Sequence, residues 1–345
     1  MRLLVVTQTI DKNDPVLGFF HRWVEELSKR CAQVEVICLK KGEYSLPSNV
    51  SVHSLGKEIG GSRFLYTLRF LRLAVSLNAR IDTVFVHMNP EYVVLMGWWW
   101  RLVGKRIALW YNHEIASPSF ALTCGLVHRV FHTSPFAASA RARNAKQMPA
   151  GIDTNLFSEQ EVARVPRSVY FQGRITEAKR IHILLSALRL VRAEGTSATL
   201  TLVGPQDALY LEQLQEEYKD LFEAGAVHVK GPVAHHETPQ LYGAHWVSVN
   251  LTAAGNFDKT VLESGACKTP VIVGSPAFKE VVPSEWTIDG TDAAALSRAL
   301  TRAFALSEAE HHALGQELRE RVIATHSLSR LMDQLYSELV GARIL

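Results

Sequence analysis

The chain has 345 residues and a mass of 38.5 kDa, a length that favours two ordinary domains or one large one. Hydrophobic residues make up 47% of the sequence and charged residues 21%, a globular composition that excludes a disordered chain and a coiled coil. The four cysteines form no CxxC pair, so neither a disulfide framework nor a zinc site is predicted. The apolar start is too short for a signal peptide, and no apolar run reaches the ~20 residues of a membrane span. We therefore expect a cytoplasmic protein.

The net charge of +3 hides an asymmetry between the two halves of the chain. Residues 1–150 contain 19 Lys and Arg against 10 Asp and Glu, or +9, which leaves 18 against 24, or −6, for residues 151–345. Such a difference indicates different partners for the two halves. The basic half could contact an anionic surface, such as the inner face of a membrane, or its charges could belong to an ordinary solvated surface.

The first half alternates short apolar runs with helical patterns. Runs typical of strands occupy residues 2–8, 33–39, 83–88 and 106–113. Between the first two, Phe20, Trp23 and Leu27 recur at spacings of three and four, which predicts a helix over residues 17–30. A basic helical stretch covers residues 62–80. This alternation is typical of a parallel sheet wrapped by helices.

The second half repeats the alternation. Strand-like runs occupy residues 168–173, 199–204, 227–231, 247–252 and 270–274, with predicted helices over 181–191 and 208–222. The fold class is therefore α/β, with two tandem Rossmann-like domains, residues 1–150 and 151–325, facing across a cleft. A helical stretch over residues 308–339 ends the chain, and we expect residues 326–345 to pack back toward the first domain.

No glycine-rich dinucleotide or P-loop motif is present, so a phosphate site has to be sought elsewhere. In the segment GRITEAKR, Arg174 and Lys179 flank a turn before a helix. Two cations there could bind a diphosphate, the arginine by its planar fork and the lysine as a point charge. The alternative is that both are solvated surface residues.

A second anion site is predicted in the segment FDKTVLESGA. Asp258 can cap a helix there, and the amides of residues 260–262 would then point at an anion with the helix dipole behind them. Glu263 lies one turn into this helix, where its carboxylate could accept hydrogen bonds from ribose hydroxyls.

These segments resemble the retaining glycosyltransferases of family 4, which have the two-domain GT-B fold. MPAGIDTNLF is similar to the segment before the family's second domain, GRITEAK to its diphosphate motif, and FDKTVLESGACKTPVIVG to its helix with the ribose-binding glutamate. GPVAHHETPQLYGAHW resembles the strand and helix that hold the base, with the backbone at Val233 as the contact. In the first half, Gly18 matches a glycine that approaches the donor diphosphate, and His113 matches a histidine near the reacting sugar.

The resemblance implies a metal-independent, retaining hexosyltransferase or related enzyme, which agrees with the absence of a DxD motif. A UDP- or GDP-sugar would be the donor, no cofactor would be needed, and a glycan or lipid-linked molecule of surface polysaccharide or glycolipid synthesis would be the acceptor. His113, Arg174 and Lys179 would be catalytic, and His87 and His113 would bind the acceptor. The predicted donor-binding residues are Gly18, Arg174, Lys179, Val233, Asn256, Asp258, Lys259, Thr260, Val261, Leu262 and Glu263.

One position departs from the family pattern. Gly255 stands where the family commonly has a first glutamate, separated from the second by seven residues, with Asn256 and Asp258 as neighbouring polar substitutes. Two alternatives therefore remain open, namely a nucleotide-sugar epimerase of the same fold and a non-catalytic subunit that binds a nucleotide sugar. No nucleic-acid role is expected.

Three consecutive tryptophans, residues 98–100, form an unusual feature near Arg101. Consecutive helical residues are ~100° apart, so at least one ring should face outward. Exposed rings beside cations would suit peripheral contact with an anionic membrane, whereas a bulky core wall or a dimer contact are the alternatives. The histidine pairs at residues 235–236 and 311–312 have no third metal ligand at a recognisable spacing, and we interpret them as surface residues.

Overall fold

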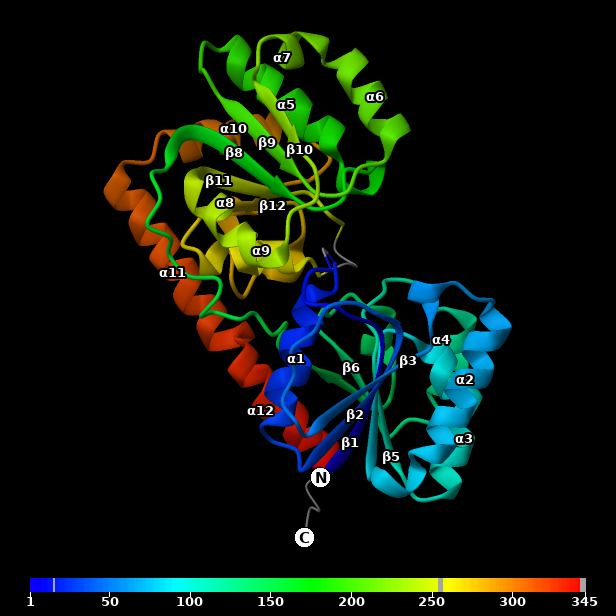
Figure 1. The fold of residues 1–345 in the computed structure, drawn as a ribbon. Coiled ribbons are helices and arrows are strands. Elements are labelled where there is room, and N and C mark those ends of the chain that lie inside the picture. Colours follow the sequence, from blue (N-terminus) through cyan, green and yellow to red (C-terminus); the bar gives the residue numbers. More distant parts are fainter. Residues whose placement is uncertain (15, 254–256, 342–345) are drawn as a thin grey trace. The chain divides into compact units, whose positions relative to one another are not determined.

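The computed structural model describes residues 1–14, 16–253 and 257–341 and divides the chain into two compact α/β units (Figure 1). Unit 1 consists of Met1–Gly151 and Leu328–Leu345, and unit 2 of Ile152–Ser327. These boundaries lie within two residues of those expected from the sequence.

Within the described residues, unit 1 is built on a parallel sheet of seven strands in the order β3-β2-β1-β4-β5-β6-β7. The inner strand β1 is apolar on both faces, because helices cover both sides of the sheet. The strands are β1 (Arg2–Ile10), β2 (Gln33–Lys41), β3 (Val50–Ser54), β4 (Thr83–His87), β5 (Arg106–Trp110), β6 (Arg129–His132) and β7 (Ala145–Gln147).

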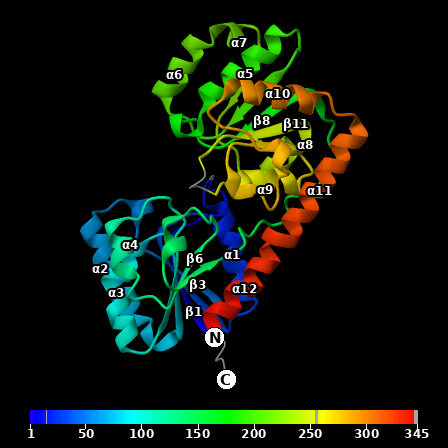
Figure 2. The ribbon, with the colours of Figure 1, turned by 180° about the vertical axis from the view of Figure 1, so that it is seen from behind.

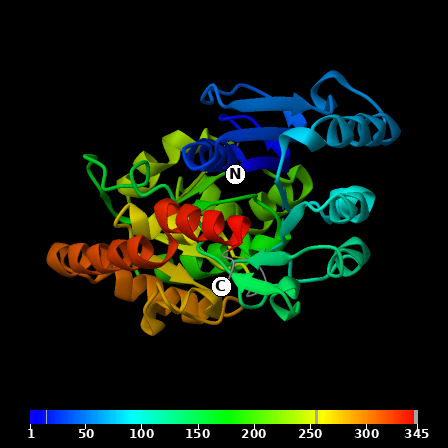
Figure 3. The same ribbon diagram turned by 90° about the horizontal axis from the view of Figure 1, so that it is seen from below.

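Helices cover the two faces of this sheet (Figures 1 and 3). One face packs against α1 (Gly18–Ser28) and α12 (Leu328–Val340), through a core that includes Trp23 and Leu331. The other face packs against α2 (Arg63–Ser76), α3 (Pro90–Leu102) and α4 (Pro118–Thr123), where Phe70 and Trp100 are fully buried. In the first of these cores, a ring contact joins α1 to the sheet, because Trp23 lies edge-on to Trp110 of β5 with ring centroids 5.0 Å apart.

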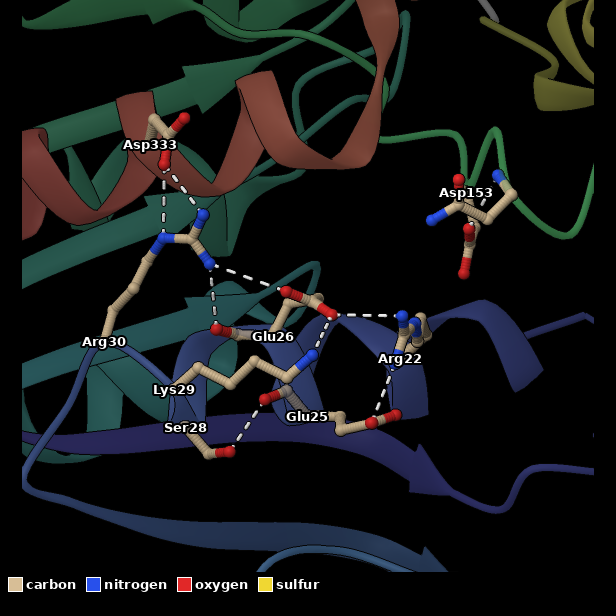
Figure 4. A network of polar contacts seen from close by, with 9 residues as sticks. Arg22, Glu25, Glu26, Ser28, Lys29, Arg30, Asp153 and Asp333 are labelled. Atoms are coloured by element: carbon tan, nitrogen blue, oxygen red, sulfur yellow. Dashed lines mark hydrogen bonds and ion pairs between the residues drawn. The ribbon is translucent and has the colours of Figure 1, made fainter.

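The last helix of the chain belongs to unit 1 and lies beside α1 (Figure 2). Figure 4 shows the ion pairs along α1, where Arg30 Nη2 lies 2.7 Å from Asp333 Oδ1 of α12 and Lys29 Nζ lies 2.6 Å from Glu26 Oε1. Exposed pairs of this kind contribute about 0.2–1 kcal/mol each, so the buried apolar side chains of α12 hold it more than these charges do. The predicted single stretch over 308–339 is in fact two helices, which break at the extended residue Ser327.

Unit 2 has a parallel sheet in the order β10-β9-β8-β11-β12. Its strands are β8 (Val165–Gln172), β9 (Thr199–Val203), β10 (Val227–Lys230), β11 (His245–Asn250) and β12 (Val271–Val273). Its helices are α5 (Ile181–Ala193), α6 (Ala208–Glu217), α7 (Lys219–Glu223), α8 (Thr238–Ala244), α9 (Lys259–Ala266), α10 (Ala293–Phe304) and α11 (Glu308–His326). The stretch predicted as one helix over 208–222 breaks at Tyr218, whose hydroxyl lies 2.7 Å from Ser186 Oγ of α5.

Both sheets reverse their strand order beside their first strand, between β1 and β4 in unit 1 and between β8 and β11 in unit 2. Ligands of doubly wound sheets bind beyond the carboxyl ends of the strands at such a reversal. None of the helices in the described ranges is both long enough and apolar enough to cross a bilayer.

Candidate functional site

The backbone loops that follow β8 and β9 in unit 2 approach each other closely. Gly204, at φ +140°, lies so near the preceding loop that a Cβ atom built on it would be 2.1 Å from the carbonyl oxygen of Gly173. Only glycine combines that φ with that contact. The two glycines therefore shape the loop in which Arg174 follows β8.

Arg174 is exposed, and its side chain makes no hydrogen bond or ion pair with any other residue that the structure describes. Lys179, five residues later, is instead mostly buried and bonded to other side chains. Its Nζ lies 2.5 Å from Asp258 Oδ2 and donates to Thr252 Oγ1 over 3.0 Å. The two predicted cations are thus in different states, one free to meet an incoming anion and one neutralised by a carboxylate.

Asp258 accepts hydrogen bonds from three side chains that come from different segments. Besides Lys179, Thr252 Oγ1 donates over 2.6 Å and Asn250 Nδ2 over 2.9 Å, all to Oδ2. Burial alone would raise the pKa of the Asp258 carboxyl, but the charge of Lys179 and these hydrogen bonds outweigh burial and lower it below its ordinary value. Asp258 is therefore ionised at neutral pH.

This arrangement corrects the prediction that Asp258 caps the helix with its side chain. Asp258 does occupy the N-cap position of α9, but its side chain makes no capping hydrogen bond. The carboxylate is drawn instead to Lys179, because a buried ammonium is a stronger partner than a backbone amide. Asn250 and Thr252, which the sequence interpretation missed, complete the network. Asn250 ends β11 and Thr252 lies two residues beyond it, so polar residues at the carboxyl end of a buried strand were the available signal.

The start of α9 presents backbone groups and few side chains. Val261 and Leu262 are fully buried, so a ligand could meet only their amides. The Val261 amide already donates weakly to the Asp258 carbonyl oxygen over 3.4 Å, and the Thr260 hydroxyl accepts from Asn250 over 3.2 Å. The site therefore offers hydrogen-bonding groups of the helix terminus beside an internal ion pair.

Glu263, one turn into α9, is buried and held at both carboxylate oxygens. Tyr242 of α8 donates its hydroxyl to Oε2 over 3.3 Å, and His235 Nε2 lies 3.2 Å from Oε1. Burial and the Glu263 charge raise the pKa of Tyr242 well above its ordinary range, so the phenol stays a donor. The interpretation of His235 as a surface residue was wrong, because its ring is half-buried between Glu263 and Phe157, whose centroid is 5.1 Å away.

Lys259 is the first residue of α9, and the pKa of its side-chain amine is lowered. Burial lowers the pKa of its amine to about 7, and the nearby Glu263 charge opposes this only in part. Val233, the predicted base contact, is half-buried in the loop between β10 and α8. Asn256, together with Gly255, lies outside the described residues.

The predicted residues of unit 1 lie at the carboxyl ends of its strands and at the start of α1. Gly18 is buried and its amide donates to the Asp14 carbonyl oxygen over 3.0 Å, so this amide is already used within unit 1. His87 ends β4 and is buried, with its ring stacked 4.2 Å from that of Phe20. This packing favours a structural role for His87, whereas His113 is exposed in the loop after β5.

The other histidine pair also departs from expectation. His311 is buried, with its Nε2 2.7 Å from the Trp246 carbonyl oxygen and its ring 4.2 Å from the Trp246 ring, so the surface interpretation was wrong for this residue too. His236 and His312 are exposed as expected. Within residues 1–14, 16–253 and 257–341, no group of three or more His, Cys, Asp or Glu side chains is arranged to hold a metal ion.

Comparison with known proteins gives a family match for part of unit 2. Residues 166–305 match the family model described as glycosyl transferases group 1, and this range contains Arg174, Lys179, Asp258 and Glu263. No curated protein sequence gives a significant match.

Solved structures of similar fold cover almost the whole chain. HepE from Anabaena, in complex with UDP and glucose, has a TM-score of 0.78 at 14% identity over 99% of this chain and 100% of its own. Sucrose-phosphate synthase from Thermosynechococcus elongatus has 0.77 at 20% identity, with the same coverage of both chains. TarM from S. aureus, in a complex that includes UDP, has 0.76 at 9% identity, again with that coverage. The predicted GT-B fold is confirmed.

Proposed function

We propose that this chain is a retaining, metal-independent glycosyltransferase that moves a sugar from a nucleotide-sugar donor to a glycan or lipid-linked acceptor. The observation that carries the proposal is that Arg174 and Lys179 follow β8 while Asp258 and Glu263 follow the paired strand β11, with Lys179 in contact with Asp258, inside the region that matches group 1 glycosyltransferases. A diphosphate needs cations and a ribose needs a fixed carboxylate, and this end of the sheet supplies both.

The donor would bind to unit 2. Exposed Arg174 would be the first cation to meet the diphosphate, and Glu263, fixed by Tyr242 and His235, would accept hydrogen bonds from ribose hydroxyls. Lys179 would contribute as the second cation while remaining in contact with Asp258. UDP is the first nucleotide to test, because HepE and TarM are similar structures in complex with UDP.

In the proposed reaction an acceptor hydroxyl attacks the anomeric carbon from the face on which the diphosphate leaves. The new bond joins the acceptor oxygen to the anomeric carbon, the bond from that carbon to the diphosphate oxygen breaks, and the hydroxyl proton passes to the leaving diphosphate. Positive charge at the site stabilises the negative charge that builds on the leaving group. Unit 1 would hold the acceptor, and exposed His113 is its candidate contact.

Two experiments test this function. A thermal-shift screen of nucleoside diphosphates and their sugars identifies the donor, because a ligand of the folded state raises the melting temperature by mass action. The selected donor is then incubated with acceptor mixtures in the presence of EDTA, and NMR reads the anomeric configuration of the product. Isomerised nucleotide sugar without any acceptor would indicate the epimerase, and donor binding without turnover would indicate a non-catalytic subunit.

A cytoplasmic enzyme that acts on lipid-linked acceptors would work at the inner face of a membrane. The excess of basic residues in residues 1–150 supports peripheral contact of unit 1 with anionic lipid.

A further inference from the structure

The outward side of α2 in unit 1 is apolar. Phe64, Leu68 and Val75 are all exposed, Phe64 by 70%. At 100° per residue these three positions fall within an arc of about 40° on the helix surface. The opposite side of the helix carries Phe70 and Ala74, which are buried in the core of unit 1. A solvent-facing helix normally places polar residues along such an outer stripe, so α2 is apolar on both its inner and outer sides.

The neighbouring helix α3 also exposes apolar side chains at its carboxyl end. Trp98 is 57% exposed and Leu102, one turn later, is 74% exposed, whereas Trp100 is fully buried. The expectation that at least one ring of the tryptophan run faces outward is therefore confirmed. The two helices pack together, since the Phe70 ring of α2 lies 4.5 Å from that of Tyr92 and 6.1 Å from that of Trp100 in α3. We call the exposed side chains of Phe64, Leu68, Val75, Trp98 and Leu102 the apolar face.

The charges around the apolar face have one sign. Arg72 is exposed on α2, about 60° from the middle of the apolar stripe, and Arg101 is exposed on α3 between Trp98 and Leu102. Residues 59–81 and 92–113 contain no aspartate or glutamate at all. At the other end of α3, the Glu91 carboxylate accepts a hydrogen bond from Ser119 of α4 over 2.7 Å. An apolar stripe on helices that carry arginines and no carboxylate in these two ranges complements a surface that is apolar inside and anionic outside.

We infer that the apolar face of α2 and α3 is a docking surface for an anionic lipid bilayer, into which Phe64, Leu68, Trp98 and Leu102 insert while Arg72 and Arg101 contact the headgroups. Tryptophan beside arginine is the combination found at membrane interfaces. A protein partner or a second copy of this chain would have to place acidic groups opposite the arginines, whereas a bilayer that contains anionic phospholipid presents negative charge over its whole surface.

This inference deepens the proposed membrane contact but does not depend on glycosyl transfer, because docking requires neither donor nor acceptor. The test is co-sedimentation of the full chain with phosphatidylcholine vesicles that contain or lack phosphatidylglycerol. We expect binding only to the anionic vesicles, with loss of binding at high salt, because attraction to headgroups is screened over about 10 Å. UDP binding, measured in the same preparations, separates failure of docking from failure of the proposed donor site.

Variants of exposed residues locate the surface without disturbing the core. Phe64→Ala combined with Leu68→Ala should weaken vesicle binding by at least about tenfold, and Arg72→Gln or Arg101→Gln should weaken it roughly fivefold each. The matched control is Leu209→Ala on α6 of unit 2, which removes a side chain that is 73% exposed and should leave vesicle binding unchanged. Melting curves establish that each variant is folded.

Three results would overturn the inference. The wild-type chain could remain in the supernatant with anionic vesicles at low salt, or the Phe64 and Leu68 variant could bind as tightly as the control. In the third, the wild-type chain would be a dimer in sedimentation equilibrium and would bind no vesicles, while the Phe64 and Leu68 variant would be a monomer. The apolar face would then be a subunit interface.

Discussion

The ion pair between Lys179 and Asp258 predicts an unusual pattern in a double-mutant cycle. Lys179→Ala removes one cation from the proposed diphosphate site and also leaves the Asp258 carboxylate without its counter-ion. Asp258→Asn removes the negative charge but keeps a side chain of the same shape beside Asn250 and Thr252. The double variant loses both charges. If Asp258 is the counter-ion of Lys179, the double variant should bind a nucleoside diphosphate more tightly than Lys179→Ala alone.

The structure sets the expected magnitudes. Loss of a charge-assisted contact to a diphosphate costs about 1.5–3 kcal/mol, or roughly ten- to a hundredfold in affinity, and an unpaired carboxylate nearby adds repulsion. Contacting groups typically couple by about 0.5–3 kcal/mol. The 2.5 Å contact and the low exposure of both side chains, 14% and 22%, favour the upper part of that range. Isothermal titration with UDP measures the affinities of the wild type, the two single variants and the double variant, from which the coupling energy follows.

Stability gives a second readout of the same pair. The folded-state pKa of Asp258 is lowered from 3.8, so its ionised form stabilises unit 2 at neutral pH, and this contribution is lost as the pH falls below the ordinary value. Lys179→Ala should lower the free energy of unfolding by about 1–3 kcal/mol at neutral pH and should flatten the acid dependence near pH ~4. UDP affinity of Lys179→Ala equal to that of the wild type, or a double variant weaker than either single one, would refute the assigned roles.

Three further predictions follow from the same unit. Arg174→Ala should reduce turnover about ten- to a hundredfold with an unchanged melting temperature, because Arg174 is exposed; a coincident loss of stability would contradict this. Glu263→Gln and Tyr242→Phe should both weaken UDP binding, and Glu263→Gln should weaken it more, because only Glu263 is proposed to contact ribose while Tyr242 orients the Glu263 carboxylate. Calorimetry with UDP compares the two variants with the wild type, and equal affinity in all three proteins would make Glu263 a structural residue. Burial lowers the pKa of Lys259 from 10.5 to about 7, so between these pH values the unfolded chain binds more protons than the folded chain, and the free energy of unfolding should rise with pH by up to a few kcal/mol. Chemical denaturation at pH ~7 and ~9 measures this rise, and Lys259→Met should abolish it. An identical rise in the variant would refute the low pKa.

Secondary structure was predictable where the hydrophobic pattern was strong. All the strands of the unit 2 sheet correspond to runs recognised in the sequence, because each is an apolar run bounded by turn residues. In unit 1 the strands β3, β6 and β7 were missed. They are short, and β3 and β7 lie at the edges of the sheet, where one side lacks a partner strand and the apolar requirement is weaker.

The chemistry of the site was predictable in part. Spacing and residue type led to the prediction of Lys179, Asp258 and Glu263 as site residues, and the structure places the first two in contact. The partners of those residues were not predictable. Asn250, Thr252, Tyr242 and His235 reach them from other strands and helices, and no local pattern encodes which side chains meet across a sheet edge.

The sequence by itself determined the alternation of strands and helices, and hence the two α/β units, because hydrophobic periodicity is a local property of the chain. The tertiary structure alone decided which group pairs with the Asp258 carboxylate. Asp258 would cap α9 by local rules, yet Lys179, 79 residues away in the chain, draws its carboxylate into an ion pair. The tertiary structure likewise decided which tryptophan of three faces outward. Burial and long-range electrostatics depend on which segments the fold brings together, and residue order along one segment cannot specify them.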